Sequence, residues 1–313
     1  MISSTATASG KTEKIKLFLA LSRTPHGLLD LATPALAALL WLGSFPPLAV
    51  ALLGFLTAFA GYTAVYALND VVDFRKDRKK IQEGGIPDAG DYLDAAMVRH
   101  PMAKGFLRFG EGVGWMVGWA VVALIGAYLL NPLCMYIFLA GCALECIYCL
   151  LLNVTHMRTL VSGLVKTSGG LAAVFAVDPH PSVLYLIMVF AWLFFWEIGG
   201  QNIPADWHDL ELDKQVEAKS IPSRFGLERA GLIVFTTLMI SFVLSGPLLL
   251  FSPAKLSPPL VGLGLAGGVY LLLLPAYNLY QTRSRSQASA LFGKASYYPL
   301  TMFIIVMIHI LSK

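Results

Sequence analysis

Charged residues are scarce in this sequence. Only 13% of its 313 residues are aspartate, glutamate, lysine or arginine, and 57% are hydrophobic. A soluble domain carries roughly 25% charged residues. A chain this poor in charge cannot cover a surface that faces water. The composition therefore excludes an ordinary soluble protein and indicates that the lipid bilayer surrounds most of the chain.

Signals for several other protein classes are missing. The first 25 residues hold four basic residues but no small-residue cleavage site after a short apolar core, so we expect 1–25 to form a cytoplasmic tail. No basic stripe lies outside the loops that flank apolar segments, which argues against nucleic-acid binding. The four cysteines fall in one apolar segment, where small packing residues explain them better than a metal or redox cluster does.

Nine apolar windows dominate the sequence, and each reaches the roughly 18 residues that indicate a transmembrane helix. We predict an all-α integral membrane protein with nine transmembrane helices arranged around a central cavity, in which 26–313 form a single domain. The predicted spans are 26–45, 48–68, 112–130, 133–152, 160–177, 183–201, 230–251, 259–280 and 296–312.

The basic residues predict the orientation of these spans. When the loops are numbered alternately, only Lys255 and Lys313 fall on one side, and the other side holds 21 of the 23 lysine and arginine residues. Loops rich in lysine and arginine stay in the cytoplasm. We therefore expect a cytoplasmic N-terminus, an external C-terminus and an active site that faces the cytoplasm, in the inner membrane of a prokaryote.

Two long polar segments, 69–111 and 202–229, lie on the predicted cytoplasmic side and hold most of the 19 acidic residues. They follow the second and the sixth span, so the two run in the same direction. Each opens with an asparagine and spaced aspartates: Asn69, Asp73 and Asp77 in the first, and Asn202, Asp206, Asp209 and Asp213 in the second. This weak internal repeat is typical of two helix groups that build one cavity between them.

Helical spacing predicts what these aspartates do. Residues four apart lie on one face of a helix, about 6 Å apart along its axis, so each motif forms an acidic stripe. Mg²⁺ takes carboxylate oxygens and shares them with substrate phosphates, and nearby basic residues would contact the remaining phosphate oxygens. Solvated loop or cap residues explain one stripe well but two stripes poorly. Neither segment has the spacing of a calcium-binding EF-hand.

Longer motifs resemble those of the UbiA family of intramembrane prenyltransferases, over most of the chain. "NDVVDFRKD" matches the family's N-D-x-x-D-x-x-x-D, and "DWHDLELD" followed by "AKSIP" matches its second motif with a downstream Lys-Ser. "SRTP", "RHPMAKG" and "YCLLLNVTHMR" resemble three further family segments. Leu152 and Asn153 stand where the family commonly has Lys-Arg, so a basic contact to the diphosphate is either missing or supplied by Arg158 or Lys166.

The resemblance implies Mg²⁺-dependent transfer of an isoprenyl chain from a prenyl diphosphate to an aromatic acceptor, a quinone precursor, within the membrane. It implies that the metal is held by Asp73, Asp77, Asp209 and Asp213, with Asn69, Asp70 and Asp206 as supporting groups. The candidate substrate contacts are Arg23, Asn69, Lys104, Arg158, Lys166, Asn202, Lys219 and Arg224.

Aromatic and acidic residues near the spans complete the candidate site. The allylic cation formed as the diphosphate leaves needs a dry pocket, and aromatic faces stabilise it by roughly 1–2 kcal/mol each; Tyr148 is the first candidate. Asp30, Glu145 and Glu197 fall inside predicted spans, where carboxylates are costly and are functional candidates by default. Glu145 either orients the acceptor or takes its proton, or else it is protonated and only hydrogen-bonded.

Other functions fit parts of the sequence. The same fold could transfer the prenyl chain to a glycerol lipid or to haem, or it could cyclise the chain as a terpene cyclase. A membrane transporter would place its binding groups near the bilayer midplane on broken helices. The polar clusters lie instead at the cytoplasmic margin, which disfavours transport.

Overall fold

The computed structural model describes residues 13–84 and 97–313 of the chain. Residues 1–12 of the predicted tail and 85–96 of the first predicted loop lie outside the described residues. All regular structure in the described part is helical, and nine of its helical segments are long and apolar enough to cross a membrane. The predicted fold class, an all-α protein with nine membrane spans, is therefore confirmed.

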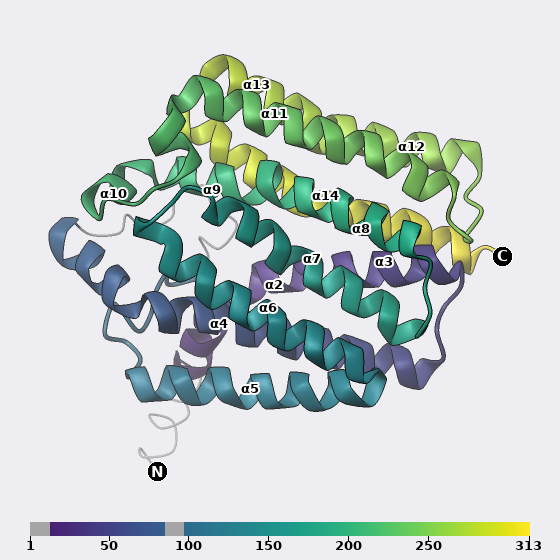
Figure 1. Cartoon of the computed structure of the whole chain (residues 1–313), viewed down its shortest axis with the longest axis horizontal. Coiled ribbons are helices and arrows are strands. Elements are labelled where there is room, and N and C mark those ends of the chain that lie inside the picture. Colours follow the sequence, from purple (N-terminus) through teal and green to yellow (C-terminus); the bar gives the residue numbers. More distant parts are fainter. Residues whose placement is uncertain (1–12, 85–96) are drawn as a thin grey trace, which may run out of the picture.

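The spans lie side by side along the longest axis of the molecule (Figure 1). In chain order the helices are α2 (Thr24–Asp30), α3 (Ala32–Leu42), α4 (Leu48–Gly84), α5 (Phe109–Leu130), α6 (Pro132–Leu150), η1 (Leu151–Asn153), α7 (Arg158–Val177), α8 (Val183–Trp196), η2 (Glu197–Asn202), α9 (Ile203–His208), α10 (Leu210–Gln215), α11 (Ile221–Leu250), α12 (Pro258–Gly268), η3 (Val269–Leu273), α13 (Leu274–Thr282) and α14 (Arg285–Leu311). The C-terminal part of α4 lies at the same end of the molecule as α10 (Figure 1). Both aspartate motifs therefore lie at this end.

Four spans extend well beyond the apolar windows. Helix α4 continues to Gly84, the sixth span continues to His208, α11 begins at Ile221 and α14 begins at Arg285. Hydropathy marks only the part of a helix that lies in lipid, whereas helical hydrogen bonds continue into water. Residues 69–84, predicted as the start of a loop, are therefore helical. They keep the helical spacing that places their aspartates on one face.

The first span is broken between α2 and α3. Pro34 lacks an N–H group, so it cannot donate a hydrogen bond to the carbonyl oxygen of Asp30, four residues earlier. The hydroxyl of Thr33 donates to that oxygen instead, at 2.8 Å. The side chain of Asp30 is buried inside the protein, 2.6 Å from the ammonium nitrogen of Lys166 on α7.

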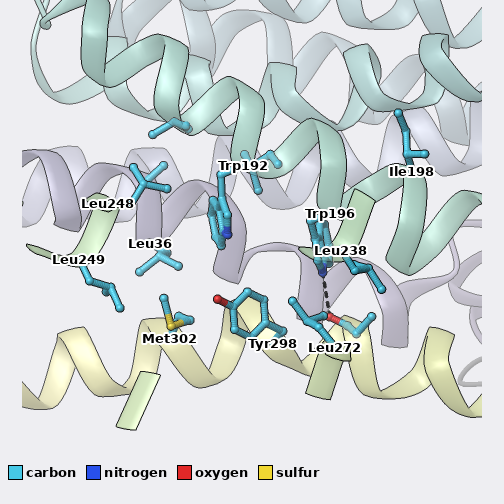
Figure 2. Packing of buried hydrophobic residues seen from close by; sticks show 14 of the residues in the cluster. Leu36, Trp192, Trp196, Ile198, Leu238, Leu248, Leu249, Leu272, Tyr298 and Met302 are labelled. Carbon is cyan, nitrogen blue, oxygen red and sulfur yellow. Dashed lines mark hydrogen bonds between the residues drawn. The ribbon is translucent and has the colours of Figure 1, made fainter. Parts of the chain in front are cut away.

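A tightly packed core joins α8, α11 and α14 (Figure 2). Trp192, Trp196 and Tyr298 are at most 1% exposed, and the indole N–H of Trp196 donates to the carbonyl oxygen of Ala295 at 3.0 Å. Apolar side chains gain little by leaving lipid, so helices in a membrane are held together by close packing and by hydrogen bonds of this kind. The core fixes α8, whose continuation through η2 and α9 carries the second aspartate motif.

Gly43, just after α3, offers a test of this packing. It adopts a left-handed φ of 69°, and a Cβ atom there would lie 2.5 Å from the carbonyl carbon of Pro253. We expect Gly43→Ala to lower the free energy of unfolding by roughly 2 kcal/mol, because both the backbone angle and the neighbouring backbone exclude a side chain. Thermal unfolding in detergent measures the loss. Gly118→Ala is the control, because that glycine on α5 has open space around it; equal losses in both variants would contradict the prediction.

Candidate active site

A cavity of about 600 Å³ lies between α2, α4, α6, α7 and the segment from η2 to α10. One part of its lining is polar and contains residues of both aspartate motifs. The remaining wall is largely apolar and reaches Phe45 after α3, Leu130 at the end of α5 and Val177 at the end of α7. Two motifs that are far apart in the sequence thus face one space with a polar end and an apolar wall.

The first motif lines the cavity from one face of α4. Asn69, Asp73 and Asp77 all belong to the lining. Because α4 is continuous through these positions, their four-residue spacing keeps them on one side of the helix. Asp70 is one residue out of this register and lines a smaller neighbouring pocket.

The second motif is positioned by two breaks in the sixth span. Pro204 cannot donate to the carbonyl four residues earlier, and the preceding segment forms the π-helix η2. Such segments, in which hydrogen bonds join residues five apart, are frequent at functional sites. The second break falls at Asp209, between α9 and α10. Asn202, Asp206, Asp209 and Asp213 all line the cavity.

Basic side chains on other elements pair with the second motif. Lys80, which continues the stripe on α4 by three residues, lies 3.0 Å from Asp213. Arg158, at the start of α7, lies 2.5 Å from Asp206. Burial raises the pKa of Asp213 by more than the ion pair with Lys80 lowers it, so this pKa lies above its usual value. These ion pairs offset part of the cost of burying several carboxylates together.

Two further cations come from the segment before α5. Arg99 lies 2.9 Å from Asp209, while His100 lies 2.9 Å from Asp77 and 3.3 Å from Asp70. Burial lowers the pKa of His100, but the attraction of Asp77 and Asp70 outweighs burial and raises the pKa to about 9. The imidazole of His100 is therefore charged at neutral pH. For the Asp209 carboxyl group, burial raises the pKa, but the ion pair with Arg99 outweighs burial and holds this pKa below its usual value.

Tyr148 and Glu145, both on α6, line the cavity between the two motifs. Glu145 Oε1 accepts a hydrogen bond from Asn69 Nδ2 at 2.6 Å, and the Tyr148 hydroxyl accepts one from Asn202 Nδ2 at 3.0 Å. The guanidinium of Arg158 lies 4.6 Å from the centre of the Tyr148 ring. Glu145 and Tyr148 therefore hold in place Asn69 and Asn202, the first residues of the two motifs.

The match to a known family includes both aspartate motifs and most of the spans. A model of the UbiA prenyltransferase family matches residues 31–305. The chain belongs to the UbiA prenyltransferase family. With nine spans in the part of the chain that the structure describes, this UbiA member is a multi-pass integral membrane protein and an enzyme of the prenyltransferase class. No curated protein matches the sequence.

Solved structures of UbiA homologues share this fold. The apo structure of a homologue from Aeropyrum pernix K1 has a TM-score of 0.72 and 18% identity, over 90% of this chain and 97% of that one. A homologue from Archaeoglobus fulgidus bound to DMAPP and Mg²⁺ gives 0.65 and 18%, over 93% and 99%. A structure of digeranylgeranylglyceryl phosphate synthase gives 0.67 and 16%, over 96% and 100%. At these identities the likeness establishes the UbiA fold.

The structure separates the predicted substrate contacts into two groups. Those that line the cavity are Arg23, Asn69, Arg158, Lys166 and Asn202. Those outside the cavity lining are Lys104, Lys219 and Arg224. The side chain of Lys219 is exposed, and its backbone N–H donates to the carbonyl oxygen of Leu152 at 2.7 Å. The backbone of Lys219 thus ties this loop to η1.

The pair at Leu152 and Asn153 has a structural role in this UbiA protein. Leu152 packs with Val216 and Ala218 in a small apolar cluster, and Asn153 Nδ2 donates to the carbonyl oxygen of Val216. Among the cations expected to replace the family's Lys-Arg pair, Arg158 lies beside the second motif. The pair itself joins η1 to the loop after α10.

Four cations near the aspartates were not predicted as site residues: Lys76, Lys80, Arg99 and His100. Lys76 lies 3.0 Å from Asp73 and donates to the carbonyl oxygen of Cys149 at 2.6 Å. Lys80 had a signal in the sequence, because it continues the stripe of Asn69, Asp73 and Asp77 by three residues. Arg99 and His100 follow a long connection, and helical spacing does not relate them to α4.

The oxygen atoms of the site fit a hard divalent cation. Asn202 Oδ1 and Asp206 Oδ2 are buried and, within the described residues, lack a hydrogen-bond partner. In the first motif, Asp70 and Asp77 offer carboxylate oxygens, which now pair with the charged imidazole of His100. Carboxylate and amide oxygens are the donors that hard cations prefer. The oxygen donors of the site therefore suit a hard divalent cation.

Proposed function

We propose that this protein transfers an isoprenyl chain from a prenyl diphosphate to an aromatic acceptor within the membrane, with Mg²⁺ as cofactor. One observation carries the proposal: residues of both aspartate motifs line the polar end of a single cavity whose remaining wall is largely apolar. The diphosphate would lie at the polar end, and the isoprenoid chain would follow the apolar wall. The similar fold of the Archaeoglobus fulgidus homologue bound to DMAPP and Mg²⁺ supports this assignment.

The residues proposed to hold the metal are Asp73, Asp77, Asp209 and Asp213, supported by Asn69, Asp70 and Asp206. Bound there, Mg²⁺ would neutralise negative charge on the leaving diphosphate. The cations that now pair with the carboxylates would contact the remaining phosphate oxygens. Arg158 is the first of these, because its planar guanidinium can donate two parallel hydrogen bonds to one phosphate group.

The aromatic side chains of the cavity suit the reacting allylic carbon and the acceptor. Tyr62, Tyr66 and Tyr148 line it close to the first motif and between the two motifs. Their faces would stabilise positive charge on the allylic carbon by roughly 1–2 kcal/mol each. The apolar wall would exclude water, which would otherwise capture the carbon in place of the acceptor. An aromatic acceptor would stack within the same set of rings, and we place this site on the cytoplasmic side.

Incubating the purified protein with labelled prenyl diphosphates and a panel of acceptors tests this function. The panel contains an aromatic acceptor, a glycerol phosphate lipid precursor, haem, and a sample with no acceptor. We expect an aromatic product whose mass equals acceptor plus prenyl diphosphate minus pyrophosphate. A lipid ether would identify a glycerol lipid as the acceptor, and a prenylated haem would identify haem. A cyclised hydrocarbon would indicate a cyclase. Prenyl diphosphate that stays intact in every sample would contradict prenyl transfer.

A further inference from the structure

Arg23, between the helical residues 13–21 and helix α2, has a strained backbone. Its angles, φ 44° and ψ 46°, are left-handed. This conformation brings the Cβ atom of an L-residue close to the following carbonyl oxygen, so residues other than glycine keep it only where their surroundings enforce it. Strained positions of this kind gather at functional sites, and Arg23 lines the cavity. The contacts around Arg23 must therefore stabilise this conformation.

The guanidinium group of Arg23 reaches the first aspartate motif. It donates a hydrogen bond to Asn69 Oδ1 at 3.4 Å and lies 3.6 Å from Asp70 Oδ1. It also lies 5.8 Å from the centre of the Tyr66 ring, which lines the same cavity. A guanidinium group can donate two parallel hydrogen bonds to one phosphate group. The left-handed backbone of Arg23 thus sets where this cation would meet a diphosphate.

Trp115 on α5 supports the residue that precedes Arg23. The indole N–H of Trp115 donates to Ser22 Oγ at 2.8 Å, and Ser22 is only 1% exposed. The Trp115 ring also stacks on the ring of Phe18, with ring centres 4.8 Å apart. Trp115 is not part of the cavity lining. It can therefore act on the site through Ser22 and Arg23, and not by touching a substrate.

Other contacts hold the neighbours of this turn. Leu21 is fully buried in a cluster with Ala67 and Met102, and the hydroxyl of Thr24 donates to the carbonyl oxygen of Leu19 at 2.9 Å. Among the interactions described, the bond from Trp115 is the one that holds the Ser22 side chain. The strain of a left-handed arginine and the net stability of one hydrogen bond are of similar size. Losing this bond should therefore shift Arg23 toward unstrained conformations.

We propose that Trp115 is a positioning residue, which through Ser22 holds Arg23 in the conformation that contacts the diphosphate group of the substrate. This inference rests on the proposed function and gives α5, which lines the cavity only with apolar residues, a part in substrate binding. Packing of α5 against residues 13–21 would need only the aromatic ring of Trp115. Positioning needs the indole N–H, so Trp115→Phe separates the two roles, because phenylalanine can still stack on Phe18.

Equilibrium dialysis of the purified full chain with labelled pyrophosphate and Mg²⁺ tests the proposal without turnover. We expect Trp115→Phe to weaken pyrophosphate binding about fivefold, the factor that corresponds to one hydrogen bond. Ser22→Ala should weaken binding by a similar factor, and the double variant by no more, because both substitutions remove the same bond. Arg23→Ala should weaken binding about tenfold, as expected for a charged contact. Adding Trp115→Phe to Arg23→Ala should then have no further effect.

The matched control is Trp119→Phe, about one turn further along α5. Trp119 meets the rings of Phe59 and Trp115 edge to face, and among the interactions described its indole N–H makes no hydrogen bond. Trp119 also lies outside the cavity lining. This variant should bind pyrophosphate as the wild type does. A loss equal to that in Trp115→Phe would assign the effect to the packing of α5 and would overturn the proposal.

Three other results would also overturn it. They are wild-type affinity in Trp115→Phe, a loss from Trp115→Phe that persists in the Arg23→Ala background, and no binding of pyrophosphate by the wild type. If Trp115→Phe does not fold, unchanged pyrophosphate binding by Ser22→Ala overturns the proposal instead. A missing product in the acceptor panel would contradict prenyl transfer but would leave these binding results unchanged, so the two failures are distinguishable.

Discussion

Asp73→Ala and Asp209→Ala should each reduce prenyl transfer by about 100- to 1,000-fold, the usual loss when a group that stabilises transition-state charge is removed. Both carboxylates line the cavity, one from each motif, and each pairs with a cation: Lys76 at 3.0 Å and Arg99 at 2.9 Å. Removing either one takes an oxygen ligand from the proposed metal site and breaks that ion pair. The leaving diphosphate would then lose part of its neutralisation.

Initial rates with a labelled prenyl diphosphate measure this loss, and gel filtration in detergent checks that each variant still folds. The matched control is Glu211→Ala, because Glu211 lies within the second motif but is exposed and pairs only with Lys214, at 2.7 Å, among the interactions described. It should keep the wild-type rate. Wild-type rates in both aspartate variants would exclude the proposed metal site, and an equal loss in Glu211→Ala would mean that the loop is perturbed as a whole.

The α4 half of the site could be predicted from the sequence because a single periodicity governs it. Asn69, Asp73 and Asp77 are four residues apart, and an uninterrupted helix keeps such residues on one face. The same rule extends to Lys80, three residues further on. The apolar windows predicted the spans for a similar reason, since the length of an apolar segment reflects the thickness of the bilayer.

The second motif was harder to predict, because its helix is irregular. The π-helix η2 changes the register before Asn202, and the break at Asp209 changes it again. Regular helical spacing therefore describes the second motif only in part. Its position in the cavity depends on α8 packing against α11 and α14, which sequence spacing does not determine.

Contacts between distant segments could not be predicted at all. Lys166 and Asp30 are 136 residues apart, and Arg99 and Asp209 are 110 residues apart. For Lys166 and Asp30 the sequence shows only a charge inside or beside an apolar span, and for Arg99 and Asp209 it shows two separate motifs without their pairing. Burial makes an unpaired charge so costly that each one must find a partner, but the identity of that partner follows from the tertiary fold.

Exhaustive chelation with EDTA should reduce prenyl transfer by about a thousandfold, and added Mg²⁺ should restore it, since several kcal/mol of charge stabilisation is lost. Without a divalent cation, only cations that already pair with the aspartates, such as Lys80 and Arg158, could neutralise the diphosphate. Buried Asp206 Oδ2 and Asn202 Oδ1 would also remain without a partner. Rates measured before and after dialysis against EDTA, and after Mg²⁺ is returned, provide the comparison.

Ca²⁺ serves as the control in this titration, because it binds carboxylates at longer distances and with looser geometry than Mg²⁺ does. We expect it to restore much less activity than Mg²⁺ at equal concentration. The dependence on Mg²⁺ should shift to higher concentration in Asp206→Asn, which keeps the size of the side chain but removes its charge. Activity that survives full chelation would show that the cations of the chain alone can neutralise the diphosphate. In that case the aspartates would serve to hold those cations in place rather than to bind a metal.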